Sequence, residues 1–152
     1  MAVTATIRET NWFTDTWNLI YGKLEDNVVN PGNQTKFIFS GFPQKLIDKK
    51  DAYPIIVISP ADVSYDPLTF NTIKRGPARI TVDVYATNPN HLDSISDAIV
   101  NTFEQEEGNL QISGISVMRL AGTSYVHYDR GAPNGFRVHN KTINYTFDFG
   151  WY

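Results

Sequence analysis

Apolar and polar side chains alternate without interruption between Arg79 and Tyr85. Ile80, Val82 and Val84 share one parity, and polar or charged residues stand between them. Successive side chains of a β-strand point to opposite faces of its sheet. The segment is therefore predicted to be a strand with one buried face and one face toward solvent.

Two other stretches space their apolar residues as an amphipathic α-helix does. The first stripe consists of Phe13, Trp17, Ile20, Tyr21 and Leu24. Its helix would be capped by Thr10 or Thr14. The second stripe consists of Leu92, Ile95, Ala98, Ile99 and Phe103. We expect its helix to begin near Asn90, whose side chain would cap it, and to end at Gly108.

Shorter elements are predicted between these segments. The apolar run Pro54–Ile58 is rich in β-branched residues and predicts a strand that is covered on both faces. Residues 36–39 suit a short strand, and residues 41–51 suit an irregular segment. Residues 61–76 contain several turn-forming residues and predict a long loop, of a length that is often functional.

The last third of the chain is predicted to be β-structure. Strands are expected over residues 112–120 and 124–129, with a break near Gly122, and a returning strand over residues 136–151. In the returning strand, alternate positions on one face are occupied by Ile143, Tyr145, Phe147, Phe149 and Trp151. Phe136 and Val138 have the opposite parity, so we expect a bulge or bend near Asn140–Lys141.

Together these elements predict an α+β fold: a mostly antiparallel β-sheet packed against two α-helices, with a long C-terminal β-hairpin. A length of 152 residues suits a single domain over residues 1–152. A domain of this size buries about 70% of the surface of its unfolded chain, so it can form a core without covalent cross-links. The absence of cysteine excludes disulfides, thiolate metal sites and a cysteine nucleophile.

Charge and hydropathy exclude further classes of protein. The net charge of −3 argues against bulk nucleic-acid binding, which favours a basic surface. No signal peptide is visible, and no window approaches the roughly 18 apolar residues of a membrane span. We therefore expect a soluble protein that has neither a membrane partner nor a specific nucleic-acid partner.

No catalytic, metal or cofactor site is predicted. If the last two β segments form a hairpin, His127 and His139 face each other, and with Asp129 they could hold a zinc ion with one open position. Two polar side chains on a solvated hairpin are the commoner origin of such a pair. The chain lacks the Gly-x-Ser-x-Gly motif and a complete phosphate loop. We expect a protein that is not an enzyme and that needs no cofactor.

Two clusters of like charge provide candidate interface residues. The acidic cluster, Glu104, Glu106 and Glu107, lies at the predicted carboxyl end of the second helix, where the helix dipole disfavours it. The basic cluster consists of Lys74, Arg75 and Arg79. These residues are either ordinary solvated surface or complementary edges of neighbouring subunits, where charge fixes the register of association.

The predicted elements follow in the order helix, apolar strand, long loop, alternating strand, helix and β-hairpin. With Tyr53–Ser59, Arg79–Tyr85 and Leu92–Phe103 in their places, the chain resembles the tail terminator (tail completion) proteins of tailed bacteriophages over roughly residues 10–150. Members of that family are small α+β proteins in which an antiparallel sheet packs against two helices. The resemblance lies in the order of the elements and in their patterns of polar and apolar residues.

This resemblance implies a structural virion protein with no catalytic residues. Such a protein forms a homohexameric ring that caps the tail tube, stops its growth and contacts the tail tube protein and the head connector or neck protein. It would reside in the tail–neck region of the virion after assembly in the host cytoplasm. Two alternatives stay open: another neck or head–tail connector protein, and a non-viral binding module of ferredoxin-like architecture.

Overall fold

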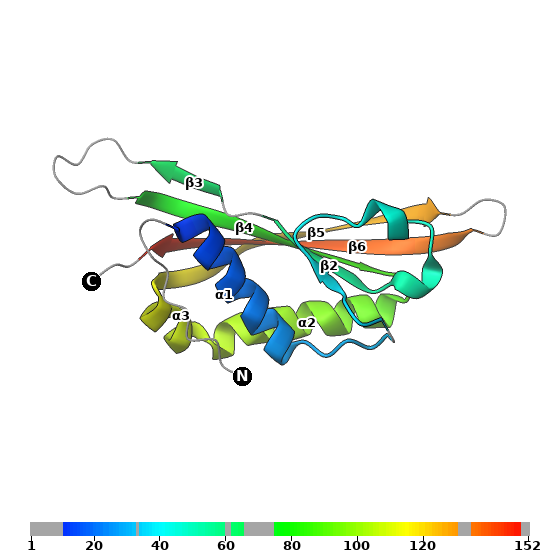
Figure 1. The fold of residues 1–152 in the computed structure, drawn as a ribbon, viewed down its shortest axis with the longest axis horizontal. Coiled ribbons are helices and arrows are strands. Elements are labelled where there is room, and N and C mark those ends of the chain that lie inside the picture. Colours follow the sequence, from blue (N-terminus) through cyan, green and yellow to red (C-terminus); the bar gives the residue numbers. More distant parts are fainter. Residues whose placement is uncertain (1–10, 33, 60–61, 66–74, 131–134, 150–152) are drawn as a thin grey trace.

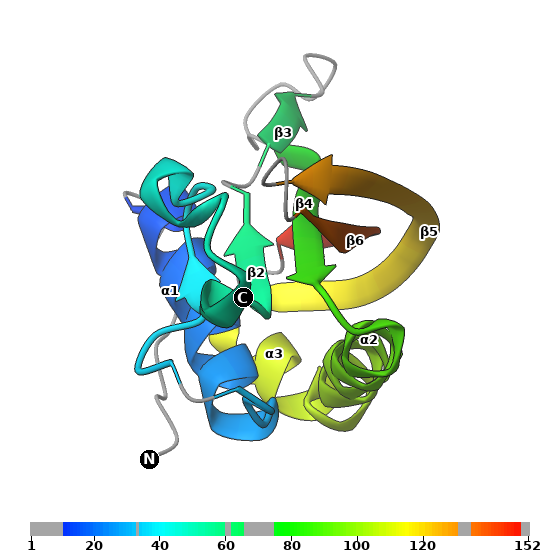
Figure 2. The ribbon, with the colours of Figure 1, turned by 90° about the vertical axis from the view of Figure 1, so that its right-hand side faces the viewer.

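The computed structural model of the protein describes residues 11–32, 34–59, 62–65, 75–130 and 135–149. Within these residues a six-stranded sheet has helices on one of its faces (Figure 1). Figure 2 shows the same arrangement turned by 90°, with α2 (Pro89–Gln105) and α3 (Glu107–Ser113) below the strands and α1 (Trp12–Asn27) at the left. The α+β class predicted from the sequence is confirmed.

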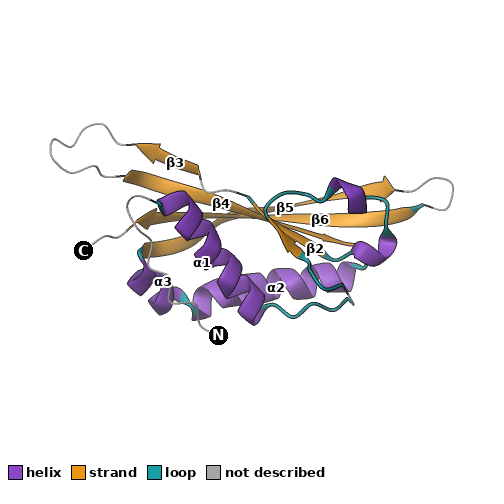
Figure 3. Ribbon diagram, in the orientation of Figure 1, coloured by secondary structure: helices purple, strands orange, loops and turns teal. Residues whose placement is uncertain are grey.

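Along the chain, helix α1 is followed by the first strands, then by helices α2 and α3, and then by the last two strands (Figure 3). In chain order they are α1 (Trp12–Asn27), β1 (Ile38–Phe39), the 3₁₀ turns η1 (Gln44–Leu46) and η2 (Lys50–Ala52), β2 (Ile55–Ile58), β3 (Asp62–Tyr65), β4 (Arg75–Ala86), α2 (Pro89–Gln105), α3 (Glu107–Ser113), β5 (Ile115–Arg130) and β6 (Phe136–Phe149).

The sheet has the strand order β1-β2-β4-β6-β5, and β3 pairs with β4 beside this path. Among the strands that the structure describes, only β1 and β2 pair in parallel; the other pairs are antiparallel, as predicted. Because β4 and β5 both run antiparallel to β6, they are parallel to each other with β6 between them. Helices α2 and α3 connect these two strands, which makes this half of the molecule a split β-α-β unit.

The main core lies between the helices and the sheet. Ile80, Val82 and Val84, the predicted buried face of β4, are at most 1% exposed. The buried face of α2 likewise follows the predicted stripe, and Phe103 stacks edge-on against Tyr145 of β6 with ring centroids 4.6 Å apart. The prediction of two helices packed on a mostly antiparallel sheet is thus confirmed, with α3 as a third helix.

A second, smaller core lies on the opposite face of the sheet. It contains Tyr53, Ile55, Val57 and Val138, and the segment that includes η1 packs over it through Phe42 and Leu46. Strand β2 therefore sends alternate residues into two cores, because Ile56 and Ile58 belong to the main one. The prediction that this strand is covered on both faces is confirmed.

The two cores also explain the change of parity in β6. The register of β6 against β4 runs without a shift from His139 to Phe147, so the bulge predicted near Asn140–Lys141 is wrong. Ile143, Tyr145 and Phe147 face the helices, whereas Val138 faces the second core. A regular strand thus buries opposite faces in its two halves, because different elements cover them.

Strand β5 is continuous where a break was predicted. Its irregularities are register shifts between Ser116 and Arg119 and between Leu120 and Gly122, and the strand continues through both. Its beginning was also misplaced, because residues 107–113 form helix α3. Gly108 lies inside that helix, and Gly114 ends it with a φ of 110°, a left-handed conformation that glycine adopts without strain.

Several local predictions need correction. Asn88, and not Asn90, caps α2: its side-chain oxygen accepts a 2.9 Å hydrogen bond from the Asn90 backbone N–H. Thr14 lies within α1 and Asn11 occupies its cap position; Thr10 lies outside the described residues. The loop predicted over residues 61–76 contains strand β3 and the start of β4, which pair with each other. Of that segment, residues 61 and 66–74 lie outside the described part.

Candidate assembly surface

One edge of the sheet is formed by β5, a strand of 16 residues (Figure 1). Among the described residues its only strand partner is β6, so its other side has no partner strand. From Gly122 to Arg130 the register with β6 is uninterrupted. A long regular edge of this kind presents unpaired backbone N–H and C=O groups and can pair with another chain.

Side chains on this stretch are exposed on both faces of the sheet. Tyr125, Val126 and Tyr128 are 52%, 45% and 40% exposed. Natural edge strands are often protected by lysine, proline or bulges. The stretch from Gly122 to Arg130 contains neither lysine nor proline, and both bulges lie before it. The prediction from sequence missed this surface, although the aromatic and β-branched composition of residues 125–128 could have indicated it.

The predicted histidine pair lies on this hairpin. His127 and His139 are direct cross-strand partners, as expected. His139 is hydrogen-bonded through Nδ1 to the Tyr125 hydroxyl, with the two atoms 2.5 Å apart, and the two rings stack. Asp129 pairs with Arg137 at 3.1 Å. Over the described residues no group of three or more histidine and acidic side chains is placed to hold a metal ion.

The predicted acidic cluster is divided between two helices. Helix α2 ends at Gln105, so Glu107 lies in the first turn of α3, where the helix dipole favours a negative charge. The predicted dipole conflict therefore does not hold for Glu107. Glu104 is exposed near the end of α2 and, after burial, is the second cause of the raised pKa of Tyr145.

Glu106 has a partner within the chain. Its Oε2 accepts a 2.7 Å hydrogen bond from the Lys23 ammonium and a 2.8 Å bond from the Asn109 amide. The Lys23 side chain is only 11% exposed, and it joins α1 to the junction of α2 and α3. These two hydrogen bonds, with that of Lys23 first, lower the pKa of Glu106. Glu106 is therefore a structural residue as well as a candidate interface residue.

The predicted basic cluster lies only partly within the described structure. Arg79 is exposed and has the parity opposite to Ala78 and Ile80, so it lies on the sheet face away from the main core. Lys74 lies outside the described residues, and for Arg75 the structure describes the backbone. Within the described chain no ion pair joins Arg79 to the acidic residues, which lie on the helix side.

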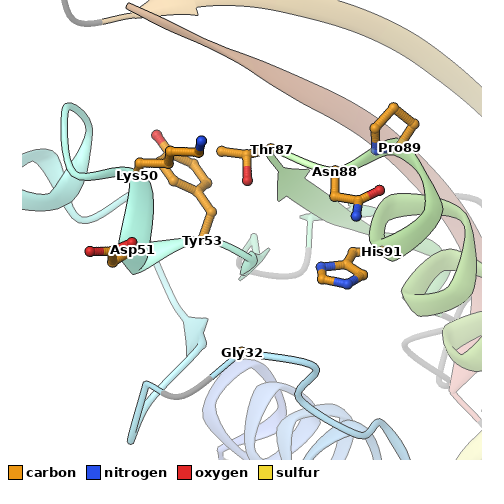
Figure 4. A pocket seen from close by; sticks show the side chains of 8 residues that line it. All are labelled: Gly32, Lys50, Asp51, Tyr53, Thr87, Asn88, Pro89 and His91. Atoms are coloured by element: carbon orange, nitrogen blue, oxygen red, sulfur yellow. The ribbon is translucent and has the colours of Figure 1, made fainter. Parts of the chain in front are cut away.

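An open hollow of about 600 Å³ lies between the segment before β2 and the start of α2 (Figure 4). Lys50, Asp51 and Tyr53 approach it from one side, and His91 and Asn88 from the other. The Asn88 side chain already caps α2, and the Tyr53 hydroxyl donates to the backbone carbonyl of Ile47 at 2.8 Å. Figure 4 shows the side chains of the lining residues spread around the hollow.

Membrane association by a spanning helix is not indicated: each helix in the described part of the chain is too short or too polar to cross a bilayer. No protein-family model and no curated protein matches the chain. Among solved structures, a chain from the virion of a native gene transfer agent (GTA) particle is similar to it. The two chains share 10% sequence identity with a TM-score of 0.42, over 86% of this chain and 92% of that chain.

Proposed function

We propose that the protein is a structural virion subunit of a tailed bacteriophage, which forms a ring that caps and terminates the tail tube and joins it to the head connector. The order of its elements supports this proposal, because the resemblance to tail terminator proteins implies an antiparallel sheet on helices. The fold has that arrangement, with the long C-terminal hairpin β5–β6.

The exposed edge of β5 is the observation that best supports an assembly role. A ring needs a surface through which each copy contacts the next, and strand edges join chains through backbone hydrogen bonds. The partners proposed are further copies of this chain, in a hexamer, together with the tail tube protein and the head connector protein. The protein would reside in the tail–neck region of the virion after assembly in the host cytoplasm, with no catalytic activity, membrane partner or specific nucleic-acid partner.

Electron microscopy and mass photometry of the purified protein test this function. We expect closed rings of about 100 kDa, six times the 17.2 kDa chain, either in solution or at the ends of tail tubes from the same phage. A strict monomer at high concentration that also leaves tail tubes uncapped would contradict the proposal. Binding to head connectors without binding to tubes would favour another neck protein. A protein that stays small until it is given a different ligand would favour a ferredoxin-like binding module.

The charged clusters give a second prediction for the ring. Replacing both Glu104 and Glu107 by lysine should weaken assembly at low salt, because like charges would then meet the basic cluster of the next subunit. Single exposed pairs contribute only about 0.2–1 kcal/mol, so the effect should disappear at high salt. Glu106 is left unchanged in this variant, since it holds Lys23.

Sedimentation velocity at two salt concentrations measures this effect. Adding Arg79→Glu to the double variant should restore part of the assembly if the two clusters meet. Normal assembly of the double variant at low salt would show that Glu104 and Glu107 are ordinary solvated surface.

A further inference from the structure

A hollow of about 250 Å³ lies where β5 ends, on the sheet face of the second core. Four aromatic residues line it, Phe42, Tyr53, Tyr85 and Tyr128, together with Gln44, Ile47, Arg130 and Val138. Pockets for drug-sized ligands usually measure about 300–1,000 Å³. This hollow is smaller and suits a single side chain.

The chemistry of the wall favours an aromatic side chain. The Arg130 guanidinium lies 5.4 Å from the centre of the Tyr128 ring, and no carboxylate of the described residues pairs with it. Guanidinium groups bind the faces of aromatic rings, and the indole of tryptophan is the best partner. The phenol of Tyr85 has no hydrogen-bond partner in the described part of the chain, and burial raises its pKa to about 12, so it stays neutral and can donate a hydrogen bond.

The chain itself carries a suitable segment, Gly150-Trp151-Tyr152, directly after β6. The end of β6, after which this segment follows, lies far from the hollow of the same molecule. Strand β6 begins beside the hollow, at Phe136 and Val138, and ends 13 residues later at Phe149. At about 3.3 Å per residue its end is about 40 Å away, whereas three extended residues span only about 10 Å.

We propose that the hollow binds the Trp151 side chain of a second copy of this chain. The contact joins opposite ends of two molecules, so it is head-to-tail, and head-to-tail contacts generate rings or filaments. The exposed edge of β5 runs directly into the hollow and can pair with the backbone of the entering segment. This inference deepens the proposed function by naming one subunit contact, but the binding step can be measured without any ring.

Fluorescence anisotropy of a labelled peptide with the sequence of residues 147–152 tests the binding step. Wild-type protein, kept dilute enough to be monomeric, should bind the peptide saturably. The Tyr128→Ala and Arg130→Ala variants should bind it about tenfold more weakly or worse, as expected when an anchor pocket loses a wall. A peptide with alanine in place of Trp151 should not compete.

Tyr125→Ala is the matched control, because Tyr125 is another exposed tyrosine of β5, on the opposite face of the sheet. It should leave peptide affinity unchanged. Absence of saturable binding, or equal losses in the Tyr125 and Tyr128 variants, would overturn the inference. Circular dichroism confirms that each variant is folded.

Mixing two variants tests the contact in the full chain. The Trp151→Ala variant keeps the hollow, and the Tyr128→Ala/Arg130→Ala variant keeps the segment, so each variant alone should stay monomeric. A mixture of the two should form a heterodimer, in which Trp151 of the second variant binds the hollow of the first. If rings form normally from Trp151→Ala chains, the proposed ring function is supported and the proposed Trp151 contact is wrong. If the peptide binds but no ring or capped tube is found, the contact stands and the proposed function is wrong.

Discussion

Replacing Glu106 by lysine is expected to lower the free energy of unfolding by about 3 kcal/mol, the lower end of the range for breaking a buried ion pair. The reason is that the Lys23 ammonium, 11% exposed and 2.7 Å from the Glu106 carboxylate, would face a second ammonium group. The lower end applies because the Glu106 side chain is 21% exposed. Urea unfolding at neutral pH measures the change.

Glu104→Lys and Glu107→Lys are the matched controls, since both residues are exposed and neither is joined to Lys23. Each should change stability by no more than about 0.5 kcal/mol. Equal losses in all three variants would show that the ion pair contributes nothing specific. A uniform result would also remove the reason for sparing Glu106 in the assembly variant.

The pH dependence of the Glu106 contribution follows from its lowered pKa. The folded pKa lies below the ordinary value of 4.5, so the stabilisation is fully present above pH 4.5 and is lost as the pH falls toward the folded value. The difference in stability between wild type and Glu106→Gln should therefore be constant near neutral pH and shrink below pH 4.5. A difference that grows in acid would contradict this assignment.

Replacing Phe103 by alanine is expected to cost about 3–5 kcal/mol, the usual range for a buried phenylalanine. Phe103 is 4% exposed and packs edge-on against Tyr145, so its removal opens a cavity between α2 and β6. The Tyr145 hydroxyl has no hydrogen-bond partner among the described residues, so the polar group beside this cavity is already unsatisfied.

Phe13→Ala provides the comparison within the same residue type. Phe13 belongs to the predicted stripe of α1 but is 46% exposed, so its loss should cost about 1 kcal/mol or less. Chemical denaturation of both variants measures the difference. Similar costs at the two sites would show that the packing of α2 on the sheet is looser than the structure indicates.

Segments with a strictly local pattern were predictable from the sequence. Helix α2 buries one face and exposes the other, and β4 fully buries the face that carries Ile80, Val82 and Val84, so the spacing of apolar residues indicates both elements and these buried faces. The other face of β4 was predicted to meet solvent, but Thr81, Asp83 and Tyr85 are half-buried there, because the second core packs against Tyr85. The boundary at Gly108 was wrong because glycine was read as a helix end, whereas Leu110 is buried and holds a further helical turn against the core.

The features that were missed depend on contacts between distant parts of the chain. Lys23 and Glu106 are 83 positions apart, and no local pattern joins them. The second core forms because residues 42–57 cover the first half of β6, around Val138. The alternation of apolar residues within β6 alone cannot reveal this. The charged clusters and the position of Arg79 on the polar face of β4 were visible in the sequence, but the internal partner of Glu106 was not.

The change of covered face along β6 restricts how the length of this hairpin can vary in evolution. Inserting or deleting one residue near Thr142 would turn either Val138 or Ile143 to the wrong side, because every further side chain changes face. Two-residue changes preserve both cores but shift every later cross-strand pair with β4 and β5. Tolerated changes in length should therefore fall outside the paired parts of β4, β5 and β6.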